Sequence, residues 1–123
     1  MRKSLMLAVI LFVAGTMGLR AQSLKNTNWK LYIDELHDTI TLHIQGDSSY
    51  VTQGNGNVVV RSVWKTMKDS VTMKDVEGQY ACPGDEGVYT YTVKENTLTF
   101  FVVGDPCEGR RNSISGAKWM KQQ

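Results

Sequence analysis

The stretch YACPGDEGVYTYTVKENTLTFFVVGDPCEGRR, residues 80–111, contains both cysteines of the chain, Cys82 and Cys107, and a run of alternating residues between them. Alternation of apolar and polar side chains with a period of two is the pattern of a half-buried β-strand. Glu95-Asn96 divides the run into two halves and suits a two-residue hairpin loop. The stretch therefore predicts a β-hairpin between the two cysteines.

A two-residue loop at Glu95-Asn96 fixes the register of this hairpin. On one face it opposes three apolar pairs: Tyr89 with Val102, Tyr91 with Phe100 and Val93 with Leu98. On the other face it gives a mixed surface: Val88 with Val103, Thr90 with Phe101 and Thr92 with Thr99. A hairpin with one thoroughly apolar face must lie against another sheet or line a barrel.

The same register brings the cysteines close together. Gly109 falls opposite Cys82, two positions beyond Cys107, and the irregular ends that contain Pro83-Gly84 and Gly104-Asp105-Pro106 absorb this offset. We predict a Cys82–Cys107 disulfide, which stabilises a domain by about 3 kcal/mol in the chain-entropy model. Free, reactive or metal-binding thiols are the competing interpretation.

The first residues of the chain have the features of a secretory signal peptide. Arg2 and Lys3 precede an apolar run, and Leu19-Arg20-Ala21 places a small residue before a cut ahead of Gln22. The run is shorter than the ~20 residues of a spanning helix, and no later stretch approaches that length, so we expect no membrane span. The sequence predicts a signal peptide at 1–21 and a bacterial periplasmic or secreted product, where a disulfide persists.

Cleavage changes the charge of the chain. Three of its 14 basic residues lie in the predicted signal peptide, which leaves 11 against 12 acidic residues, a net charge of −1 instead of +2. A nucleic-acid-binding protein normally carries a basic surface, so we expect no nucleic acid as partner. The 102 residues of 22–123 suit a single small domain, and no repeat or linker divides it.

Short alternating segments upstream of the cysteines are separated by turn residues, with hardly any helical periodicity. Gly54 to Asn57 is the clearest turn, and the segment after it places Val58, Val60, Ser62 and Trp64 on one face. A last strand is expected within 113–121. About eight strands in sequential hairpins predict an all-β fold, a small antiparallel up-and-down barrel, with a β-sandwich as the alternative.

Two motifs resemble those of lipocalin-like, or calycin, barrels. Asn26-Thr27-Asn28-Trp29 looks like the Gly-x-Trp entry to the first strand, with Asn in place of the glycine. Gly109-Arg110-Arg111 resembles the late basic residue, which in that family packs across the entry Trp. The segment from Cys82 to Trp119 is also similar to small secreted bacterial lipocalin-like proteins, most of them uncharacterised. The resemblance implies a barrel whose open mouth admits a small hydrophobic molecule.

Eight strands enclose either packed side chains or one small ligand, so two interpretations of the interior stay open. In the first, Trp64, Tyr89, Tyr91 and Phe100 line a ligand pocket. In the second, the same rings fill the core, with the Tyr hydroxyls bonded at the rim. We assign Trp29 and Trp119 to structural packing where the barrel closes. The resemblance further implies that Arg110 or Arg111 covers Trp29 by a cation–ring contact.

Catalytic signals are few. His37 lies in a predicted turn and His43 points away from the apolar face of its strand, so both are expected to be solvated. No serine has a nucleophile-elbow pattern, and we expect no enzyme activity, cofactor or metal site. The leading hypothesis is non-catalytic binding of a small hydrophobic or amphipathic molecule. The alternative is a cell-envelope protein-interaction or inhibitor module with a filled core, whose loops at 54–57 or 83–87 contact a partner.

Overall fold

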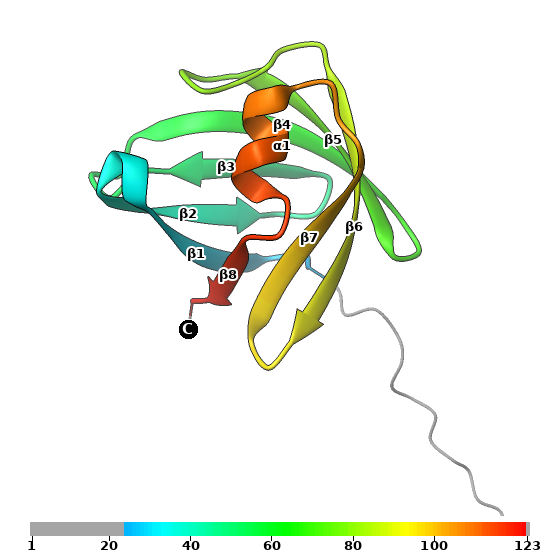
Figure 1. Ribbon diagram of the computed structural model, residues 1–123, viewed down its shortest axis with the longest axis horizontal. Coiled ribbons are helices and arrows are strands. Elements are labelled where there is room, and N and C mark those ends of the chain that lie inside the picture. Colours follow the sequence, from blue (N-terminus) through cyan, green and yellow to red (C-terminus); the bar gives the residue numbers. More distant parts are fainter. Residues whose placement is uncertain (1–23, 123) are drawn as a thin grey trace, which may run out of the picture.

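The computed structural model describes residues 24–122, which form an all-β closed barrel (Figure 1). Each strand pairs antiparallel with the next along the chain, and the last strand returns to the first. This is the predicted up-and-down barrel, and it excludes the β-sandwich. The predicted signal peptide, 1–21, lies outside the described residues. The elements are β1 (Thr27–Ile33), the 3-10 turn η1 (Asp34–Leu36), β2 (Asp38–Ile44), β3 (Ser48–Thr52), β4 (Val58–Met67), β5 (Ser70–Glu77), β6 (Glu86–Lys94), β7 (Thr97–Gly104), α1 (Glu108–Ile114) and β8 (Lys118–Lys121).

The β6–β7 hairpin has the predicted register. The apolar pairs Tyr89–Val102, Tyr91–Phe100 and Val93–Leu98 are all present. Glu95 and Asn96 form the loop with φ values of 52° and 65°, the left-handed conformation that lets a two-residue turn follow the twist of its strands. A register shift between Val88 and Tyr89 places Val88 opposite Gly104, so the expected pairing of Val88 with Val103 is wrong.

A bulge in β4 changes which residues face inward. The expected alternation put Val58 and Val60 on the same face as Trp64, but the pairing with β3 shifts between Val51 and Thr52, which leaves Val59 as an extra residue in β4. One extra residue in a strand reverses the alternation on its far side. As a result Val59 is buried while Val58 is exposed, and Ser62 and Trp64 keep their inward positions.

The chain between β7 and β8 is helical, which the sequence patterns did not predict. Residues expected to lead into a closing strand within 113–121 instead form α1, whose N-cap is Cys107, and β8 has only four residues. Trp119 of β8 lies opposite Leu98 of β7, and Met120 lies opposite Lys30 of β1. The short β8 therefore closes the barrel between two longer strands.

The predicted disulfide between Cys82 and Cys107 is present, with 6.1 Å between the Cα atoms. It links the loop between β5 and β6 to the start of α1.

Trp29 and Trp119 are almost fully buried in one apolar cluster, together with Tyr89, Leu98 and Phe100. No helix among residues 24–122 is both long enough and apolar enough to cross a bilayer.

Candidate functional site

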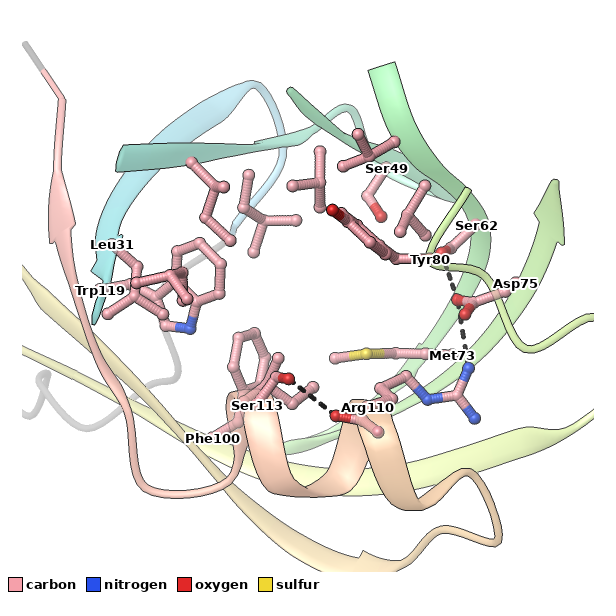
Figure 2. Close-up of a pocket in the computed structure, with 18 of the residues that line it drawn as sticks. Leu31, Ser49, Ser62, Met73, Asp75, Tyr80, Phe100, Arg110, Ser113 and Trp119 are labelled. Carbon is pink, nitrogen blue, oxygen red and sulfur yellow. Dashed lines mark hydrogen bonds and ion pairs between the residues drawn. The ribbon is translucent and has the colours of Figure 1, made fainter. Parts of the chain in front are cut away.

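A cavity of about 610 Å³ opens inside the barrel. Most of its wall is apolar and comes from inward-facing residues of β1 to β5, while α1 covers one side (Figure 2). Tyr80, on the loop after β5, reaches toward the centre of the cavity. A smaller hollow on the outside adjoins the exposed Arg61–Glu77 ion pair and has little apolar wall. The interior cavity is therefore the candidate binding site.

The four residues predicted to contact a ligand divide into two pairs. Trp64 and Phe100 line the cavity, and their rings meet edge to face with centroids 6.0 Å apart. Tyr89 and Tyr91 do not line it. Tyr89 is fully buried behind Phe100, with ring centroids 6.2 Å apart. The predicted aromatic face therefore contributes partly to the cavity and partly to the core beside it.

A buried ionic network forms one end of the cavity, and Arg110 of α1 is its centre. Its Nε and Nη2 donate to the two carboxylate oxygens of Asp105 at 2.7 and 2.8 Å. Its Nη1 lies 3.1 Å from Asp75 of β5, an ion pair drawn in Figure 2. The side chains of Arg110, Asp75 and Asp105 are 8%, 4% and 0% exposed. Arg110 thus joins the helix, the barrel wall and the loop before α1.

Polar neighbours donate further hydrogen bonds to both carboxylates. Ser62 donates its hydroxyl to Asp75 at 2.7 Å, and the backbone N–H of Cys82 donates to the other Asp75 oxygen at 2.9 Å. Asp105 accepts from the hydroxyl of Tyr89 and from the backbone N–H of Cys107. Gly87 allows this arrangement, because a Cβ there would lie 2.4 Å from a carboxylate oxygen of Asp105. The network is therefore supported from β4, β6 and the disulfide loop.

The network shifts the ionisation of its members. Burial alone would raise the pKa of Asp105, but hydrogen bonds from Arg110, Tyr89 and the Cys107 backbone outweigh it and hold the pKa below its ordinary value. Burial, followed by the bond to Asp105, raises the pKa of the Tyr89 hydroxyl. The bond to Asp105 likewise raises the pKa of Arg110. Asp105 is therefore ionised, and Tyr89 neutral, around neutral pH.

We expect the stability of the protein to fall in acid through Asp105. A carboxylate whose folded pKa is depressed contributes stability that is complete above its unfolded value, 3.8, and is lost as the pH drops through the lower folded pKa. Urea unfolding at a series of acidic pH values measures this loss. In Asp105→Asn, the free energy of unfolding should depend less on pH below the unfolded pKa of 3.8. An unchanged pH dependence in this variant would contradict the assignment.

The expected cover of Trp29 by Arg110 or Arg111 is wrong. Arg110 is held by its two aspartates, and Arg111 donates to the backbone carbonyl of Asp105 at 2.7 Å. The cation beside the Trp29 ring is Lys121 of β8, 6.0 Å from the ring centroid. The helical path of 108–114 is the physical reason, because it directs Arg110 to the buried carboxylates instead of to the barrel seam.

His37 occupies the turn after η1, as expected. The other histidine, His43, was expected to be solvated, but it is half-buried. Its ring stacks on Tyr50 at 4.4 Å and lies within hydrogen-bond distance of Asn28 and Thr52. Burial lowers the pKa of His43. Its contacts are with neighbouring strands, and it does not line the cavity.

Sequence reasoning missed Asp75 and Tyr80. Asp75 follows Val71 and Met73 on the inward phase of β5, and all three are buried. An aspartate in that position requires a buried partner, which was an available signal. Tyr80 lies in an irregular loop, where alternation gives no information. No cluster of three potential metal ligands occurs within 24–122.

Comparison with known proteins identifies no relative. The chain matches no protein-family profile, no curated protein and no solved structure.

Proposed function

We propose that the protein binds a small apolar or amphipathic molecule in the barrel cavity and catalyses no reaction on it. The cavity carries the proposal: 610 Å³ lies within the range of about 300–1,000 Å³ of ligand pockets in proteins. Its wall is mostly apolar, and Ser62, Asp75 and Arg110 form a polar end. Such a division suits a molecule with an apolar body and one polar group. The resemblance of the entry motif at Asn26 to Trp29 to that of lipocalin-like barrels points to the same use.

We further propose that binding takes place outside the cytoplasm, in the periplasm or after secretion. A Cys82–Cys107 disulfide persists in oxidising compartments and is rare in the cytosol. The basic and apolar residues of 1–21 support this address. Mass spectrometry of the mature protein from its own host tests it: a chain that begins near Gln22 supports export, and an intact Met1 contradicts it.

A cavity-filling variant tests the binding proposal. Leu31 lines the cavity from β1, and Leu31→Trp adds bulk inside it. We expect affinity for the uncharged fluorescent probe N-phenyl-1-naphthylamine to fall at least about tenfold, or about 1.4 kcal/mol. Fluorescence titration gives the affinity, and circular dichroism checks the fold.

The matched control is Tyr32→Trp on the same strand, whose side chain is 57% exposed and points outward. It should leave probe affinity unchanged. If Leu31→Trp folds and keeps the wild-type affinity, the probe binds elsewhere and the cavity is not the site. Absence of probe binding to the wild type would also count against the proposal.

A further inference from the structure

The charges around the cavity indicate which polar group a ligand carries. Glu35, Asp75 and Arg110 are the charged residues among the described ones that line it. The single cation among them is already paired with Asp75 and with Asp105 behind it. Counting Asp105, three carboxylates and one guanidinium surround the cavity, which gives its surroundings a formal charge of −2.

Arg110 has little capacity left for an anionic ligand. Two of its nitrogens donate to Asp105, and Nη2 also donates to the backbone carbonyl of Asp85 at 3.0 Å. A ligand carboxylate would have to displace one of these buried partners or lie beside the carboxylates while losing its own hydration. Both alternatives are costly, because an ion that leaves water needs an opposite charge and hydrogen bonds in return.

Unsatisfied donors near the cavity favour an acceptor over a cation. The indole Nε1 atoms of Trp64 and Trp119 and Nη1 of Arg110 are buried and make no hydrogen bond to any described residue, although Nη1 is within ion-pair distance of Asp75. All three side chains belong to the cavity wall. A neutral carbonyl, ester or hydroxyl oxygen accepts such bonds without adding charge, whereas an ammonium group cannot accept a hydrogen bond.

We propose that the cavity takes an uncharged lipophilic molecule with one hydrogen-bond-accepting group, and discriminates against the carboxylate of the same chain length. This inference rests on the proposed binding function and narrows it to a ligand class. Glu35 of η1 and the Asp75–Arg110–Asp105 network are the residues that set the discrimination.

A series with one alkyl chain and different polar groups tests the inference. Methyl dodecanoate, dodecanoate and dodecyltrimethylammonium are titrated, below micelle formation and at neutral pH, against protein carrying N-phenyl-1-naphthylamine. We expect the ester to displace the probe with at least about tenfold higher affinity than either ion. Equal or tighter binding of either ion overturns the inference and leaves the binding function standing. Failure of all three compounds and of the probe overturns both.

The variant Glu35→Gln tests the electrostatic cause, because Glu35 lies outside the buried network. Removing its charge should raise the affinity for dodecanoate relative to the ester by about twofold to fivefold, the range for exposed charges. Asp34→Asn is the control, because Asp34 precedes Glu35 in the same turn but does not line the cavity. An equal change in both variants would show that net charge, and not the cavity, causes the preference.

Discussion

Replacing Arg110 with methionine should destabilise the protein by about 3–5 kcal/mol, the usual effect of removing one partner of a buried ion pair. The loss is large because the carboxylates of Asp75 and Asp105 would remain buried without a cation. Methionine keeps much of the apolar stem of the side chain, so the packing of α1 changes less than the charge does. Urea unfolding followed by tryptophan fluorescence measures the difference in the free energy of unfolding.

Arg61→Met is the matched control for Arg110→Met. Arg61 also forms an ion pair, 3.2 Å from Glu77, but the two side chains are 51% and 64% exposed. Water and salt screen such a pair, so the expected loss is at most about 1 kcal/mol. Equal losses in the two variants would contradict the central role of the buried network. A loss below about 1 kcal/mol for Arg110→Met would do the same.

The double variant Cys82→Ser/Cys107→Ser should lose about 3 kcal/mol, because the bridge closes a loop across a sequence separation of 25 residues. The bridge also connects the segment that contains Tyr80 to Cys107, the N-cap residue of α1. Both segments border the cavity, so we expect faster amide hydrogen exchange in 78–85 and 108–114, with less change in β1 to β3.

A reducing agent provides the control for the disulfide prediction. It should lower the unfolding midpoint of the wild type toward that of the double variant and leave the double variant itself unaffected. A wild type that resists denaturant equally well with and without reductant, under conditions where free thiols are detected, would show that the bridge contributes little to stability.

The barrel could be predicted from the sequence because alternating side chains and turn residues determine strands and hairpins locally. The Glu95-Asn96 loop fixed the pairing of Tyr89 with Val102 and brought the two cysteines together, as the structure confirms. The positions of the β-bulges could not be predicted from the sequence. The shift in the β3–β4 pairing at Thr52 makes Val59 an extra, buried residue, and no local residue pattern shows where a strand takes up an extra residue.

The candidate site was only partly predictable. Trp64 and Phe100 were found because inward-facing aromatic residues in a small barrel reach its interior. Arg110 was selected from a motif but given the wrong partner, since its path depends on a helix of only seven residues that shows no apolar stripe in EGRRNSI. Its pairing with Asp75 joins residues far apart in the chain, and only the closed barrel brings them together.

The brevity of β8 has a consequence for biosynthesis. Residues 118–121 supply the hydrogen bonds that join β7 to β1, so seven strands can form on a nascent chain while the barrel still has two unpaired edges. Such edges are the sites at which extended chains associate with one another. Until residues 118–121 have left the ribosome, the nascent chain therefore depends on delay, dilution or a chaperone to keep these edges from associating with other chains.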